Sequence, residues 1–199
     1  MQVSEVEISM DLENDAYIKA IEHLPTALQQ SYENVVSKGK LQLNDTIITR
    51  AILLRLRQFY LSQNATKKFL NKNVSGAASD FFVETVLFFI KAFIETHDLG
   101  FLAASERTIR SSNKTLRPDI SIWLDENLIA CIECKTQLGW NRDKWRVDFL
   151  NRDKKLMDKY PDVQTYLLVM TTRNWSGFGD DPYIGKKFFC SIKYMASRN

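Results

Sequence analysis

The segment that most constrains the fold runs from residue 119 to residue 135. Residues 120, 122 and 124 are apolar while 119 and 121 are polar, and this alternation is typical of a half-buried strand. Asp125-Glu126-Asn127 is a turn sequence, and residues 128–135 form a second run rich in apolar side chains. A three-residue loop would pair Leu124 with Leu128 and place Asp119 directly opposite Glu133. The sequence therefore predicts a hairpin that carries two neighbouring carboxylates.

The chemistry of this hairpin follows from the spacing of its charged side chains. Directly opposed residues in an antiparallel pair have Cβ atoms about 4.5–5.5 Å apart, so two like charges repel unless a cation lies between them. Lys135 is two residues beyond Glu133 and points to the same side. Hard carboxylate oxygens suit Mg²⁺, which binds through one or two carboxylates together with substrate phosphate. Asp119, Glu133 and Lys135 are therefore candidates for phosphodiester hydrolysis.

Pro118-Asp119 followed by Glu133-Cys134-Lys135 resembles the signature of the PD-(D/E)XK nuclease superfamily, most closely that of a type II restriction endonuclease. The resemblance covers about residues 79 to 172. It implies an α/β, restriction-endonuclease-like core in which helices flank a mixed central sheet. It also implies that Asp119 and Glu133 hold Mg²⁺, with Mn²⁺ as a substitute, and that Lys135 assists catalysis. The alternative is a surface hairpin with an ordinary Glu–Lys pair.

The predicted elements of the second part follow the order of that nuclease core, which is helix, three strands, helix and strand. We expect a helix over 80–97, a strand over 101–109, a polar turn at 111–115, the hairpin, a helix over 141–160 and a strand over 163–171. The loop at 175–181 contains glycines but no phosphate-loop pattern, so we expect a flexible connection there.

The N-terminal part is predicted to be helical. Residues 15–24 and 25–37 are expected to form consecutive helices, with Pro25 in the first turn of the second. Residues 46–63 are apolar around more than one narrow stripe, which predicts a well-buried helix. We accordingly divide the chain into a helical region, 1–73, and a nuclease core, 74–199.

Glu84 is a further candidate metal ligand. Some members of the superfamily place a metal-binding glutamate in the helix before the first strand, and the resemblance extends this role to Glu84. The alternative is that Glu84 lies on a solvated helix face together with Lys91 and Glu95 and has no role in metal binding.

The basic residues are too few to prove nucleic-acid binding, because the net charge is only +3 with a pI near 8.7. Phosphate contacts must therefore come from local clusters. The candidate DNA-binding residues are Arg107, Arg110, Lys114, Arg117, Gln137 and Arg142. A helix packed by its tryptophans, with charges paired at i,i+4, is the alternative for the region around Arg142. Arg50 and Arg57 share a helix face and could contact DNA phosphates. We favour the interpretation that they form a solvated face.

Other chemistries find little support. The apolar run 81–94 contains two charges and is too short to span a bilayer. Three cysteines leave one unpaired and favour a reducing, cytoplasmic location. Cys131 and Cys134 match CxxC, but thiols three apart on a strand point to opposite faces, so we expect buried free cysteines. No GxGxxG or Walker A sequence occurs, and His23 and His97 lie far apart.

Two classes of function remain. The first is a Mg²⁺-dependent endonuclease that acts on double-stranded DNA, of the type found in a restriction system, with a resolvase or repair nuclease as the nearest rival. The second is a non-cleaving DNA-binding or assembly module on a nuclease fold. The intact Asp119, Glu133 and Lys135 favour the first. A membrane is not an expected partner, and a homodimer is left open.

Overall fold

The computed structural model describes residues 15–39, 41, 45–111, 114–136, 144–171 and 178–192. The chain divides into two compact units, 1–41 and 42–199. Among its described residues, the first unit contains α2 (Ala16–Ser37), which begins where the Asp15 carboxylate accepts a hydrogen bond from the Tyr17 amide at 2.6 Å. The predicted break before Pro25 is wrong, because Pro25 lies inside this helix. The proline costs one backbone hydrogen bond, but strong helix formers such as Ala20, Leu24 and Ala27 flank it.

The second unit starts with α3 (Asp45–Phe69), which packs on α4 (Ser79–Thr96). The Arg55 guanidinium lies 3.8 Å from the centre of the Phe88 ring, and the rings of Phe59 and Phe81 stack at 4.7 Å. Only one side of α3 is buried, since its side chains Ile47, Leu54 and Leu61 are exposed. The prediction of a well-buried helix is therefore wrong for the outer side. The division of the chain at residue 73 stays a prediction.

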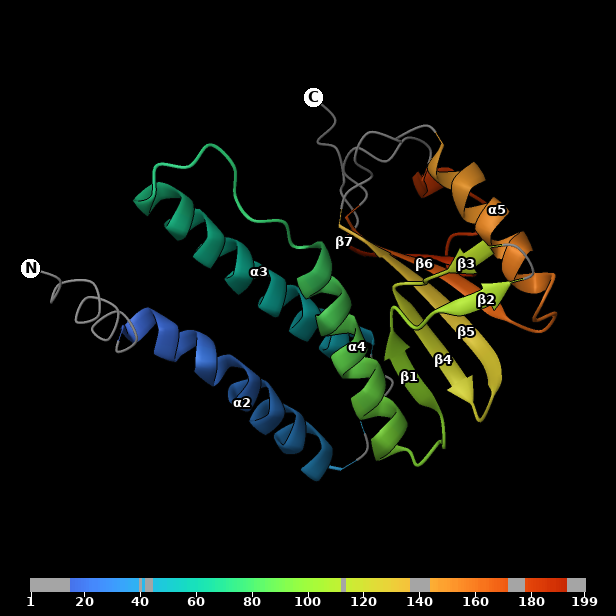
Figure 1. Ribbon diagram of the computed structural model, residues 1–199, viewed down its shortest axis with the longest axis horizontal. Helices are drawn as coiled ribbons and strands as arrows, with labels where there is room; N and C mark the ends of the chain where they lie inside the picture. The colour runs from blue at the N-terminus through green and yellow to red at the C-terminus, as the bar shows by residue number, and fades with distance from the viewer. Residues whose placement is uncertain are drawn as a thin grey trace, which may run out of the picture. The chain divides into compact units, whose positions relative to one another are not determined.

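A five-stranded mixed sheet follows the helices (Figure 1). Its strands, in spatial order, are β1 (Leu102–Ser105), β4 (Ile120–Leu124), β5 (Asn127–Lys135), β6 (Gln164–Thr171) and β7 (Phe188–Ile192). The β1–β4 and β4–β5 pairs are antiparallel, whereas β5–β6 and β6–β7 are parallel. The predicted α/β class with a mixed sheet flanked by helices is thus confirmed.

The predicted strand over 101–109 is in fact two elements. β1 ends at Ser105, and Glu106 has φ +50°, a left-handed conformation that cannot continue a strand. β2 (Ile109–Ser111) then pairs with β3 (Lys114–Leu116) in a separate two-stranded ribbon, where the sequence predicted only a turn.

The β4–β5 hairpin has the register that the sequence predicted next to Asp119, although the turn differs. Leu124 pairs with Asn127, so the loop has two residues, and Asp125 at its start has φ +51°. A bulge after this turn shifts the register, and Ile122 then pairs with Ala130 and Ile120 with Ile132. The bulge supplies the extra residue that the predicted three-residue loop would have contained.

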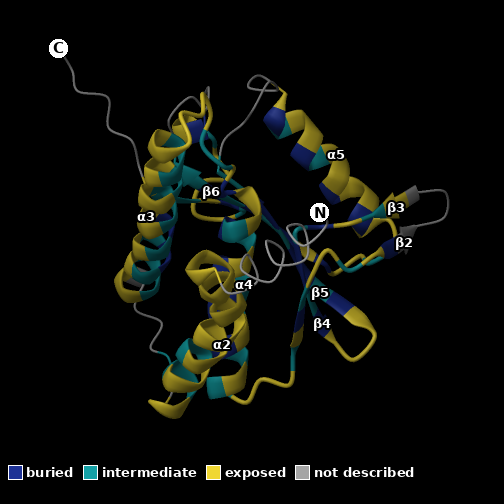
Figure 2. Cartoon of the chain, turned by 60° about the vertical axis from the view of Figure 1, so that its left-hand side comes forward, coloured by how far each residue is buried: buried dark blue, intermediate teal, exposed yellow. Residues whose placement is uncertain are grey.

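The two faces of the sheet meet different partners. One face carries Ile122, Ala130 and Ile132, which line an apolar pocket together with residues of α3 and α4. The other face is covered by α5 (Trp145–Met157). Trp145 and Phe149 of this helix pack against β6 and β7, and its Leu156 packs against β4 and β5. Figure 2 shows the buried residues in dark blue along β4 and β5. None of the helices in the described part of the chain is long and apolar enough to cross a membrane.

Neither β7 nor the packing just before it was expected from the sequence. Phe178 is fully buried at the start of a short 3-10 helix, η1 (Phe178–Asp180), so the expected flexible connection is wrong for residues 178–180, while 175–177 lie outside the described residues. Phe188 is also fully buried, and its ring centre lies 5.2 Å from those of both Trp145 and Phe149. These aromatic rings join β7 to α5.

Phe188 and its neighbour offer a matched test of this packing. Phe188→Ala should lower the free energy of unfolding by about 3–5 kcal/mol, because it leaves a cavity among aromatic rings. Phe189→Ala should cost about 1 kcal/mol or less, since that side chain is 39% exposed. Urea denaturation followed by tryptophan fluorescence measures both, and equal costs would contradict the described position of β7.

Candidate active site

The structure brings Asp119, Glu133 and Lys135 together. Asp119 lies immediately before β4, while Glu133 and Lys135 lie near the end of β5, which pairs with β4. The Lys135 ammonium nitrogen is 3.1 Å from Asp119 Oδ2 and 3.3 Å from Glu133 Oε2. Lys135 therefore bridges the two carboxylates, as the hairpin register led us to expect.

Hydrogen bonds from the ends of two strands, β1 and β5, hold Asp119 in place. Its Oδ2 accepts a hydrogen bond from the Cys134 amide at 2.8 Å. Its carbonyl oxygen accepts from the Ser105 hydroxyl at 3.0 Å and from the Glu106 amide at 3.2 Å. The preceding Pro118 is fully buried and restricts the backbone there. Asp119 is thus fixed by contacts with the ends of both β1 and β5.

The charge state of Lys135 follows from its surroundings. Burial acts to lower the pKa of Lys135, but the charges of Asp119 and Glu133 and the hydrogen bonds to both outweigh burial, so the pKa is raised above its ordinary value. The amine is therefore protonated throughout the neutral range. It can stabilise negative charge, but it cannot act there as a general base.

Glu133 has a second cationic partner that the sequence analysis missed. Its carboxylate is only 7% exposed, and its Oε1 forms an ion pair with Nη1 of Arg152 on α5. Arg152 lies one helical turn beyond Phe149 and one before Leu156, both of which pack toward the sheet. That helical spacing was the available signal, since side chains three or four apart share a helix face.

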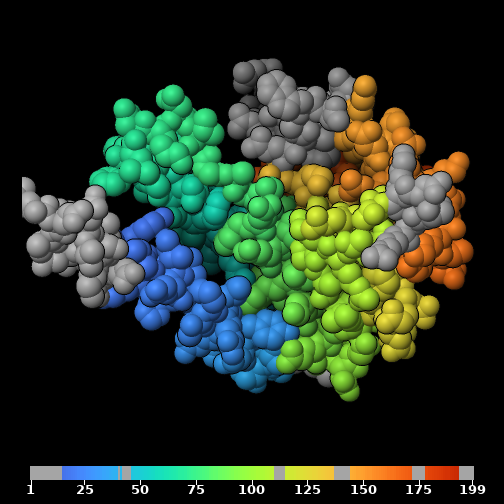
Figure 3. Space-filling view, viewed as in Figure 1, coloured from blue at the N-terminus to red at the C-terminus, as the bar shows by residue number. Residues whose placement is uncertain are grey.

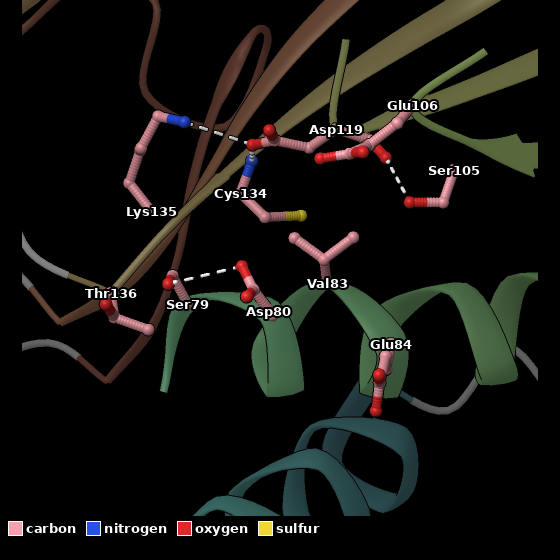
Figure 4. Close-up of a pocket in the computed structure, with 10 residues that line it drawn as sticks. All are labelled: Ser79, Asp80, Val83, Glu84, Ser105, Glu106, Asp119, Cys134, Lys135 and Thr136. Atoms are coloured by element: carbon pink, nitrogen blue, oxygen red, sulfur yellow. Dashed lines mark hydrogen bonds and ion pairs between the residues drawn. The ribbon is translucent and has the colours of Figure 1, made fainter. Parts of the chain in front are cut away.

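A pocket of about 500 Å³ opens beside Asp119 and Lys135 (Figure 4). It lies between the start of α4, the end of β1, the residue before β4 and the end of β5. Its lining residues are Ser79, Asp80, Val83, Glu84, Ser105, Glu106, Asp119, Cys134, Lys135 and Thr136. Figure 3 shows α4, in green, beside the yellow-green segment that includes β1 to β3. The pocket offers room for a bound group next to Asp119 and Lys135. Glu133 is not one of its lining residues and instead lines a small cavity beside Phe149 and Arg152 of α5.

Acidic residues other than the predicted ones line the same pocket. Asp80, in the first turn of α4, and Glu106, after β1, were not singled out from the sequence. Glu84 lines the pocket, but its carboxylate is turned away from Asp119 in Figure 4, and its metal-binding role stays a prediction. Within the described residues, no three acidic, histidine or cysteine side chains form a ready-made metal cluster.

Asp119 and Glu133 nevertheless fit the donor chemistry of Mg²⁺. This ion keeps several waters and needs only one or two protein carboxylates together with phosphate oxygens. Both carboxylates lie within hydrogen-bonding range of one ammonium group, so their oxygens are near enough to share a cation. Lys135 then remains available to a neighbouring phosphate oxygen.

The predicted DNA-binding residues are only partly described. Arg117 pairs with Glu106 at 2.9 Å and has a side chain that is 59% exposed. The Arg107 guanidinium lies 4.1 Å from the centre of the Trp123 ring. The side chains of Arg110 and Lys114, and the whole of Gln137 and Arg142, lie outside the described residues. Contact of this group with DNA stays a prediction.

The cysteines behave as the sequence predicted. Cys131 packs on the α5 side of the sheet, whereas Cys134 lines the pocket beside α4. Both are buried and free. Burial raises the pKa of Cys131 to about 12, and burial together with the Asp119 charge raises the pKa of Cys134 further. Neither thiol is therefore poised to ionise at neutral pH.

The raised pKa of Lys135 gives a measurable prediction. Asp119→Asn should lower it, because one of the two charges that hold the proton is removed while burial persists. Since the folded pKa lies above the unfolded one, the stability from this interaction is present at neutral pH and is lost as pH rises through the raised folded pKa. NMR titration of the lysine side chains in labelled protein measures the shift. Glu106→Gln is the control, because Glu106 pairs with Arg117, and an equal shift in both variants would contradict the assignment.

No protein-family model, curated protein or solved structure matches this chain.

Proposed function

We propose that the chain is a Mg²⁺-dependent endonuclease that hydrolyses phosphodiester bonds of double-stranded DNA, of the restriction type. The observation that carries the proposal is the bridge from Lys135 to Asp119 and Glu133 at the edge of a pocket of about 500 Å³. Paired carboxylates beside a lysine that is protonated at neutral pH suit a reaction in which a phosphate gains negative charge in the transition state. The chain would act in the cytoplasm.

Each residue has a distinct role in this proposal. Asp119 and Glu133 supply the carboxylate oxygens that hold the metal, and the metal when bound supplies Lewis acidity and lowers the pKa of a water. Lys135 donates a hydrogen bond from its ammonium group to a phosphate oxygen as charge develops there. Its raised pKa suits this role, because the donor stays charged at neutral pH. The exposed side chain of Arg117, beside the pocket residue Glu106, would contact a neighbouring phosphate of the same strand.

A second candidate is supported by the ion pairs themselves. Glu133 forms ion pairs with both Lys135 and Arg152. Asp119 forms an ion pair with Lys135 and accepts a hydrogen bond from the Cys134 amide. Such a network is also what a stable, non-cleaving DNA-binding module would retain. A resolvase or repair nuclease would use the same residues as a restriction enzyme and would differ only in the DNA that it recognises.

The proposal is tested by incubating a sequenced plasmid with the protein in Mg²⁺ and, in a separate reaction, in EDTA. Discrete fragments that appear only with Mg²⁺ support a restriction-type enzyme, because cleavage then occurs at defined sites. A smear, or cutting only at branched DNA, would favour a nonspecific nuclease or a resolvase. Binding without cleavage in either Mg²⁺ or Mn²⁺ would support the non-cleaving module instead.

Alanine variants separate the roles of the three residues. Asp119→Ala and Glu133→Ala should each reduce cleavage by about 100-fold or more and weaken Mn²⁺ binding, because a metal-binding oxygen is lost. Lys135→Ala should reduce cleavage to a similar extent without weakening Mn²⁺ binding, because it removes only a cation. Calorimetry measures the metal affinity and gel assays the cleavage. Glu106→Gln is the pocket control, and full activity in any of the three variants would place the site elsewhere.

The exposed arginines of α3 provide a test of DNA contact outside the site. Arg50 and Arg57 lie seven residues apart on one helix and are both exposed. If they contact phosphates, the double change to glutamate should weaken DNA binding by about tenfold or more and leave Mn²⁺ affinity unaltered. Fluorescence anisotropy with labelled duplex DNA at two salt concentrations measures this. Unchanged affinity for DNA would mean that these arginines belong to a solvated helix face and do not contact DNA.

A further inference from the structure

The ion pair between Arg152 and Glu133 has a consequence for metal binding that reaches beyond the three motif residues. Glu133 has only two carboxylate oxygens, and both face cations. Its Oε1 contacts Arg152, while its Oε2 lies 3.3 Å from Lys135. A divalent ion that uses Glu133 must therefore approach a carboxylate oxygen that already contacts a positive side chain, and the like charges repel.

The backbone of Arg152 is held firmly, so only its side chain can respond. The next residue, Asp153, accepts hydrogen bonds from the Thr165 hydroxyl on β6 and from the Lys187 ammonium, both at 2.6 Å. Phe149 and Leu156, on either side along α5, are buried against the sheet. These contacts hold α5 in place.

The guanidinium itself has access to solvent. The Arg152 side chain is 45% exposed, whereas the carboxylate it contacts is almost fully buried. Arginine carries a planar fork of donors that matches two oxygens of a phosphate, and it stays charged at every relevant pH. A guanidinium that left Glu133 would therefore be free to pair with a phosphate of a bound substrate.

We propose that Arg152 and a divalent cation compete for Glu133, and that metal binding releases Arg152 to a phosphate of the DNA substrate. This inference rests on the proposed nuclease function. Arg152 is then a residue that positions Glu133 before the metal binds and becomes a phosphate contact afterwards. The charges of Asp119, Glu133, Lys135 and Arg152 sum to zero before the exchange. A divalent ion in place of Arg152 leaves one positive charge, which a phosphate of the substrate would offset.

The first test measures metal binding without cleavage. Arg152→Gln should bind Mn²⁺ roughly 3- to 10-fold more tightly than the unmodified protein, because a competing charge is removed. Arg152→Lys should bind close to the unmodified level, since the charge is kept. Lys155→Gln is the matched control, because it removes an exposed charge from the same helix. Isothermal titration calorimetry on the full chain gives these affinities. Unchanged or weaker binding by folded Arg152→Gln would overturn the proposal.

The second test uses the unmodified protein and so does not depend on the folding of a variant. The guanidinium signals of ¹⁵N-labelled arginine should shift for Arg152 on addition of Mg²⁺, with the assignment taken from Arg152→Lys. A further shift should follow on addition of a short duplex in Ca²⁺, which replaces Mg²⁺ so that the DNA stays intact. An Arg152 signal that is unaffected by saturating Mg²⁺ would contradict the exchange.

Failure of this inference and failure of the nuclease proposal are distinguishable. If the unmodified protein neither binds Mg²⁺ or Mn²⁺ nor cleaves DNA, the nuclease function is wrong and the exchange falls with it. If the unmodified protein binds metal and cleaves, but the Arg152 signal and the Arg152→Gln affinity do not change, only the exchange is wrong.

Discussion

The arrangement of the candidate site depends on a simple electrostatic constraint. Two carboxylates on neighbouring strands repel one another unless a cation lies between them. Lys135 meets this requirement by contacting Asp119 and Glu133 at the same time. The β4–β5 register, with its bulge, places the carboxylates opposite each other, and the raised pKa of Lys135 keeps the bridging charge in place.

The sheet separates this charged cluster from the apolar pocket on its other face. Side chains alternate between the faces of β5, so Ile132 lines the apolar pocket with α3 and α4 while Glu133 faces α5. Helix α5 in turn depends on aromatic packing against β6 and β7. The position of Arg152 at Glu133 is therefore a result of packing that begins as far along the chain as Phe188.

The same contacts are compatible with catalysis and with a purely structural role. Two cations around Glu133 stabilise a buried charge whether or not the protein cleaves DNA. The catalytic proposal rests on the pocket beside Asp119, because a solely structural ion pair does not require such a space.

Much of the site was determined by local sequence. Alternating apolar residues and a turn predicted the hairpin, and a period of two along each strand was enough to place Asp119, Glu133 and Lys135 together, even though the turn itself was assigned one residue too long. The helices α3 and α4 and the strand β6 were likewise predicted from periodicity. In each of these cases the residues that form the predictive pattern lie close together in the chain.

Only the tertiary structure decided the rest. Arg152 reaches Glu133, and Phe188 reaches Trp145, because α5 and β7 pack on a shared core, and no local pattern specifies contacts across such separations. The left-handed Glu106, which ends β1 and donates its amide to the Asp119 carbonyl, depends on a neighbouring strand in the same way. Local periodicity thus determined which residues share a strand face, whereas the packing of distant elements determined which charges surround them.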